Sequence, residues 1–216
     1  MPRWSGLAPV QLILAVAILT LGIPASITAF HGLGFYSRVD PTGHQGGENI
    51  AALEQEVPRT DAEGRDLAFA LLAHGNDPEL SAPERTRIVT RAALGFRDYL
   101  SRVPADGQAW AGLASAHLQL SDLRSGAEAL RMSILTSPWS ESLVQWRCGL
   151  GIDLYRALDG EERELMRGQF RVAAQRSASA LAQTVISRNG VRIARVFLAS
   201  SPEELIKFEA ELAKRR

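Results

Sequence analysis

The chain has 216 residues, and its 24 Lys and Arg side chains are balanced by 24 Asp and Glu side chains. A formal net charge of zero argues against nucleic-acid binding, because nucleic-acid-binding domains usually carry a basic surface. The single cysteine, Cys148, excludes an internal disulfide and a cysteine-based metal site. Ala, Leu, Arg and Glu are abundant and alternating runs of Val, Ile and Thr are absent, which predicts an all-α fold.

An uncharged apolar segment occupies residues 10–30, after a short tail at residues 1–9. Its length at the helical rise is sufficient to cross a bilayer, so we expect one transmembrane anchor. A cleaved signal peptide ending near Ala29 and a buried helix are the alternatives. Arg3 precedes the segment, and Arg38 follows it close to Asp40. This slight bias predicts a single-pass inner-membrane protein whose remaining chain lies in the periplasm.

Residues 31–59 are rich in Gly and Pro, which predicts a flexible linker that holds the following domain away from the membrane. His31 and His44 lie in this linker and are interpreted as solvated side chains. The domain itself is predicted to cover residues 60–216.

Two capping-box spacings mark the first helices of this domain. Thr60 and Glu63 begin a helix that ends near Gly75, and Ser81 and Glu84 begin a second that ends at Pro104. Apolar periodicity and turn residues then predict seven further helices. Their expected ranges are 109–120, 123–136, 140–158, 161–175, 177–187, 191–199 and 203–214.

Residues 105–138 carry the spacing of a helical-hairpin repeat. Its positions are Trp110, Leu113, Ala114, Gly126, Leu130 and Pro138, and Ala92, Phe96 and Pro104 precede Gly126, Leu130 and Pro138 by one period of about 34 residues. Residues 60–138 therefore resemble two tetratricopeptide (TPR-like) repeats. The resemblance implies a short TPR-like solenoid in which Trp110 is a core residue and Gly126 lets the paired helices approach closely.

Residues 127–170 resemble a segment of small membrane-anchored TPR-like proteins of alphaproteobacteria. The matching positions are Ala129, Leu130, Arg131, Ser133, Thr136, Pro138, Leu143, Arg147, Leu150, Gly151, Leu154, Leu158, Glu161, Glu162 and Arg163. Such proteins are associated with cell-surface polysaccharide genes. The resemblance implies a role in the cell envelope and names no activity.

The candidate ligand surface consists of Trp139 and two arginine rows. The rows are Arg163, Arg167 and Arg171, spaced four apart on one helix, and Arg188, Arg192 and Arg195 near the next turn. Guanidinium rows can bind carboxylates or phosphates, and an exposed Trp can stack on a sugar or anchor a peptide. For the arginines the first interpretation is a solvated face paired with Glu161, Glu162 and Glu164, and a site for an acidic polymer or an acidic partner segment is the alternative.

No convincing catalytic group is found. Asp159, Glu161 and Glu162 are interpreted as a favourable helix start, since acidic residues stabilise helix N-termini. His117 and Trp146 are interpreted as packing residues and Cys148 as a core thiol. We therefore predict no catalytic, cofactor-binding or metal-binding residue.

The expected function is a non-catalytic, membrane-tethered scaffold that binds a protein partner in cell-envelope or exopolysaccharide assembly. The alternatives are a binding module for an acidic glycan and an accessory enzyme acting on the polysaccharide.

Overall fold

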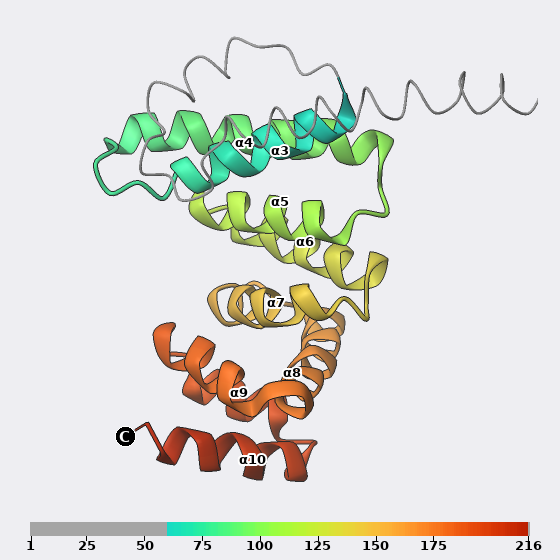
Figure 1. Ribbon diagram of the computed structural model, residues 1–216, viewed down its shortest axis with the longest axis vertical. Coiled ribbons are helices and arrows are strands. Elements are labelled where there is room, and N and C mark those ends of the chain that lie inside the picture. The colour runs from blue at the N-terminus through green and yellow to red at the C-terminus, as the bar shows by residue number, and fades with distance from the viewer. Residues whose placement is uncertain (1–59, 216) are drawn as a thin grey trace, which may run out of the picture.

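The computed structural model describes residues 60–215, which form eight α-helices and no strand (Figure 1). The all-α prediction is confirmed for this part of the chain. The expected anchor at residues 10–30 and linker at residues 31–59 lie outside it. None of the helices in the described residues is long and apolar enough to cross a membrane. The helices are α3 Asp61–His74, α4 Ala82–Arg102, α5 Gly107–Gln119, α6 Leu123–Thr136, α7 Glu141–Asp153, α8 Gly160–Ser187, α9 Val191–Leu198 and α10 Pro202–Ala213.

The two capping boxes form as the sequence predicts. The backbone N–H of Glu63 donates to the Thr60 hydroxyl at 3.2 Å, and the Thr60 N–H donates to the Glu63 carboxylate at 3.2 Å. In α4 the Ser81 N–H donates to the Glu84 carboxylate at 3.1 Å. These contacts satisfy backbone N–H groups that a helix start otherwise leaves without a partner.

One predicted break is found and one predicted boundary changes. The helices expected at 161–175 and 177–187 are the two halves of α8, separated at Ser177, whose φ of −158° and ψ of 89° are not helical. The Ser177 hydroxyl accepts the Ala180 N–H at 3.1 Å and so caps the second half. The helix expected at 140–158 ends at Asp153. Leu154 and Leu158 remain buried in the loop that follows, so the apolar pattern continues beyond the helix.

Consecutive helices pack as pairs, α3 with α4, α5 with α6 and α7 with α8. The pairs stack along the long axis of the molecule, and α9 and α10 close the far end (Figure 1). Within the stack, α3 contacts α5 and α5 contacts α7, while α4 packs on α5 and α6 on α7. The first helices of the pairs, α3, α5 and α7, therefore form one layer. The second helices α4 and α6 pack against this layer.

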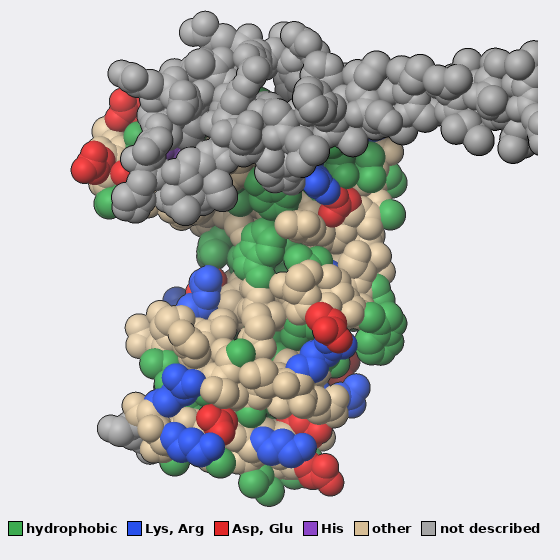
Figure 2. All heavy atoms as spheres, viewed as in Figure 1, with side chains coloured by type: hydrophobic (Ala, Val, Ile, Leu, Met, Phe, Trp, Pro, Cys, Tyr) green, Lys and Arg blue, Asp and Glu red, His purple; other side chains and the backbone are tan. Residues whose placement is uncertain are grey.

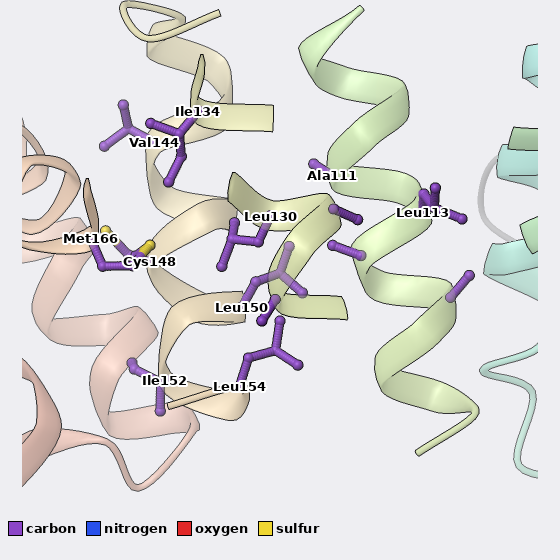
Figure 3. Packing of buried hydrophobic residues seen from close by; sticks show 14 of the residues in the cluster. Ala111, Leu113, Leu130, Ile134, Val144, Cys148, Leu150, Ile152, Leu154 and Met166 are labelled. Atoms are coloured by element: carbon purple, nitrogen blue, oxygen red, sulfur yellow. The ribbon is translucent and has the colours of Figure 1, made fainter. Parts of the chain in front are cut away.

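The core runs continuously through the stack. Leu130 of α6 lies between α5 and α7, next to Leu150 and Leu154, and Cys148 of α7 faces Met166 of α8 (Figure 3). All of these side chains are no more than 2% exposed. Each pair is thus held by apolar burial against the next, as expected for stacked elements that cannot bury their faces alone.

Gly126 lies at the contact between α5 and α6, where the repeat pattern places it. A Cβ atom there would lie 3.0 Å from Leu154 Cδ2 and 3.4 Å from the Ala114 carbonyl oxygen. Gly126→Leu is therefore expected to overpack the contact and lower the free energy of unfolding by roughly 1–3 kcal/mol. Urea denaturation measures this change.

The control for this substitution is Gln183→Ala, because Gln183 is exposed on α8 and should tolerate the change within about 0.5 kcal/mol. Gln119 is unsuitable as a surface control, since its amide donates to the Asn76 side chain at 3.1 Å. Equal losses for Gly126→Leu and Gln183→Ala would contradict the close approach of α5 and α6.

Candidate functional site

An open groove of about 440 Å³ lies between α4 and α6, and α5 forms its floor. The floor residues are Trp110, Leu113 and His117, and the α4 wall carries Arg97, Leu100 and Ser101. On each helix the lining residues lie three, four or seven positions after the first of them, so they share one face. On α5 they extend over about two helical turns, or about 10 Å. The groove thus has a defined length and is open to solvent.

Arg97 and His117 form the polar centre of this groove. The Arg97 Nη2 lies 3.2 Å from His117 Nε2, and the ring nitrogen on the other side, Nδ1, lies 3.1 Å from the Asp122 carboxylate. A guanidinium only donates, so Nε2 is the acceptor and the imidazole proton is on Nδ1. His117 is buried, as a packing residue should be, and it also fixes the guanidinium of Arg97 at the groove wall.

The α6 wall of the groove contains an ion-paired carboxylate and two apolar side chains. Glu128 accepts from Arg124 Nε at 3.0 Å, so its carboxylate is already paired. Ala129 and Met132 complete the apolar part of the groove. Among the described residues, by contrast, no carboxylate forms an ion pair with Arg97. The groove therefore combines an apolar surface with one guanidinium that has no counter-ion among residues 60–215.

Trp110 differs from its predicted place in the core, because it is only partly buried and lines the groove. Its indole N–H donates to the Pro104 carbonyl at 2.8 Å. An indole N–H needs an acceptor, and this one is found in the loop between α4 and α5 rather than in the apolar interior. Trp110 and Pro104, which the repeat pattern singles out, are thus in direct contact.

The environment of His117 predicts a pH dependence. Burial, reinforced by the nearby Arg97 charge, lowers the pKa of His117 below 6.5, against the opposing attraction of Asp122 and Glu128. A base whose pKa is lowered on folding binds more protons unfolded, so its contribution weakens as pH falls below about 6.5. From pH 7 to pH 5, wild type should therefore lose more stability than His117→Gln, as measured by urea denaturation. Equal losses would contradict the buried, neutral imidazole.

Four arginines of the predicted ligand surface have partners within the chain. Arg167 pairs with Glu164, Arg188 pairs with Asp153, and Arg195 donates to Glu209 at 2.6 and 3.0 Å. The guanidinium of Arg163 lies over the ring of Tyr155, 5.2 Å from its centroid. These contacts agree with the interpretation of the arginine rows as a solvated face.

The expected pairing of these rows with Glu161 and Glu162 is wrong. Arg131 of α6 donates to Glu161 at 3.0 Å, and Arg124 of α6 donates to Glu162 at 2.9 Å and through a second, shorter bond. This difference comes from tertiary packing. Because α6 packs against the first turns of α8, its arginines reach these two carboxylates. Glu162 also accepts the Asp159 N–H at 2.8 Å, and its own N–H donates to Asp159, so this acidic cluster builds a helix start.

The remaining predicted surface residues are Arg171, Arg192 and Trp139. Arg171 and Arg192 are exposed, and among the described residues no ion pair is formed by either. Trp139 follows α6 and is 77% exposed, and it does not line the groove described above. Basic and acidic side chains are intermixed on the C-terminal half of the face seen in Figure 2, so this face carries no continuous basic surface.

Cys148 and Arg147 are buried side by side on α7. Burial raises the pKa of the Cys148 thiol well above its usual range, which disfavours the thiolate that a nucleophile requires. Burial lowers the pKa of Arg147 to about 10, so its guanidinium stays charged at neutral pH. The structure brings together no group of three or more His, Cys, Asp or Glu side chains, within residues 60–215, that could hold a metal ion.

The sequence alone does not indicate this groove. Its residues Arg97, Leu100, Glu128 and Met132 come from two helices that are not neighbours along the chain, and each has an ordinary place in an amphipathic pattern. Comparison with known proteins adds no assignment: no family model matches the chain, and no curated protein or solved structure matches it.

Proposed function

We propose that this chain is a non-catalytic, membrane-tethered, TPR-like scaffold that binds a protein partner in cell-envelope or exopolysaccharide assembly. The observation that carries the proposal is the open groove across α4, α5 and α6 in a stack of helix pairs. Stacked helical hairpins present extended surfaces to protein segments. The paired acidic cluster at Asp159 and the buried thiol of Cys148 have structural surroundings that favour binding over catalysis.

The membrane and polysaccharide parts of this proposal rest on the sequence. The uncharged residues 10–30 support an anchor, and the resemblance of residues 127–170 supports a place beside polysaccharide genes. An anchored protein remains in the membrane pellet after carbonate extraction. A soluble product that starts near Phe30 would instead identify a cleaved signal peptide.

Binding of an acidic glycan is the second candidate. Arg171 and Arg192 are exposed cations without an ion pair among the described residues, and Trp139 is 77% exposed. Direct glycan binding predicts that alginate, used as an acidic test polysaccharide, binds the purified protein in low salt and is released as salt rises. Loss of this binding in Arg171→Ala, Arg192→Ala and Trp139→Ala combined would support that candidate.

The experiment for the scaffold is complementation of a deletion strain, with surface-polysaccharide output as the readout. The variant Asp159→Asn with Glu161→Gln removes two carboxylates of the acidic cluster and leaves the buried Glu162 in place. A scaffold predicts output close to wild type, because the change affects only exposed charges at a helix start, worth about 0.3–1 kcal/mol each. A folded double variant with output as low as the deletion strain would favour the enzyme.

A further inference from the structure

We infer that the groove between α4 and α6 binds a short segment of the partner that carries an apolar side chain beside a carboxylate. This inference rests on the proposed scaffold function and specifies its binding site and ligand chemistry. It places the partner on the side of the stack where α4 and α6 form the walls of the groove and α5 forms its floor.

The charge requirement comes from Arg97. Its guanidinium is held 3.2 Å from His117 Nε2, a neutral acceptor, and no described carboxylate forms an ion pair with it. The other charged groups at the groove are already matched, since Glu128 pairs with Arg124 and Asp122 faces His117. A carboxylate of the partner would provide the counter-ion of Arg97 and accept charge-assisted hydrogen bonds, which guanidinium groups form in a fork geometry.

The apolar requirement comes from the floor and the α6 wall. Leu113 and Met132 lie beside Trp110, whose indole N–H is already used by the Pro104 carbonyl. What Trp110 offers a ligand is therefore its ring surface. A flexible Met and an aromatic face suit an inserted Leu or aromatic side chain better than a sugar hydroxyl.

The dimensions limit the length of the ligand. The lining residues on α5 extend over about 10 Å, which an extended peptide spans with about three residues. The volume of about 440 Å³ accommodates the side chains of such a segment. The groove is too short for a long helix. A peptide of a few residues with adjacent Asp or Glu and Leu or aromatic side chains fits both the charge and the space.

The test is selection of a random heptapeptide library displayed on phage against the full-length protein in detergent micelles. Selected peptides are expected to share an acidic residue next to an apolar one. One of them, labelled with fluorescein, then serves as the probe for affinity measurements by fluorescence anisotropy. Arg97→Glu reverses the charge at the wall, and Ser101→Trp fills the groove from an exposed position.

Both groove variants are expected to weaken binding by at least about tenfold, because they replace an attraction by a repulsion or remove the space. Arg192→Glu, with the same change of net charge outside the groove, should leave the affinity within about twofold. Circular dichroism confirms that each variant is folded. A basic consensus, no consensus, or equal affinities for Arg97→Glu and Arg192→Glu would overturn the inference. The complementation assay tests the scaffold function separately. A negative result in the peptide-binding assay would therefore contradict the proposed groove ligand and not the scaffold function.

Discussion

Replacing Arg147 by alanine is expected to lower the free energy of unfolding by about 3–5 kcal/mol, as measured by urea denaturation. Arg147 is 0% exposed, and its guanidinium donates only to uncharged oxygens. Nε donates to the Ser133 hydroxyl at 3.0 Å, Nη2 to the Ser133 carbonyl at 2.5 Å, and Nη1 to the Ser137 carbonyl at 2.9 Å. The side chain thus ties the end of α6 to α7.

The loss in Arg147→Ala combines two effects. Removing the side chain leaves a cavity in the core, and it takes one hydrogen-bond donor from each of the Ser133 and Ser137 carbonyls. Arg147→Lys should recover only part of the loss, because an ammonium on a longer flexible stem does not reproduce the fork. The matched control is Arg156→Ala, since Arg156 is exposed and should change stability within about 0.5 kcal/mol. A loss below 1 kcal/mol in Arg147→Ala would contradict the buried contact network.

Glu162→Gln is expected to destabilise the protein by about 1.5–3 kcal/mol, because charge-assisted hydrogen bonds to a buried carboxylate are replaced by weaker ones. The Glu162 side chain is 1% exposed and joins Arg124 of α6 to the first turn of α8. Arg124 is 47% exposed, so water can solvate its guanidinium when the charge of Glu162 is removed. The loss in the free energy of unfolding should therefore be smaller than for Arg147→Ala.

The comparison with Glu161→Gln separates a structural carboxylate from a surface one. Glu161 is 64% exposed and pairs with Arg131, so its loss should cost no more than about 1 kcal/mol. Both free energies come from the same denaturation assay. Equal losses for the two substitutions would mean that the Glu162 carboxylate does not link α6 to α8. If output falls in Glu162→Gln, a scaffold requires the fall to match the loss of folded protein.

The local features of the fold are predictable because their causes are close together in sequence. The Thr60 and Ser81 capping boxes depend on residues three positions apart, and both form as expected. The break near Ser177 is also recognisable, since a Ser hydroxyl can replace a backbone acceptor at a helix start. The sequence places the break correctly, and whether it separates two helices or kinks one depends on packing.

The buried Arg147 and the groove depend on contacts between distant helices. Arg147 has the residue type of a solvated position, and only the packing of α6, α7 and α8 encloses it. Arg97 and Trp110 likewise come together only when α4 packs on α5. Trp110 occupies the predicted repeat position, but its polar N–H keeps it at the edge of the core. Periodicity identifies which face of a helix is apolar, and it does not identify the helix that covers it.

The measurement that most directly tests a protein-binding scaffold is site-specific photocrosslinking in living cells. A p-benzoylphenylalanine residue at Ser101, in the groove, is compared with the same residue at Gln183, on exposed α8. The account predicts a discrete protein adduct at Ser101, no such adduct at Gln183, and loss of the adduct when Arg97→Glu is added. No adduct at Ser101 from a folded protein, or the same adduct from both positions, would contradict it.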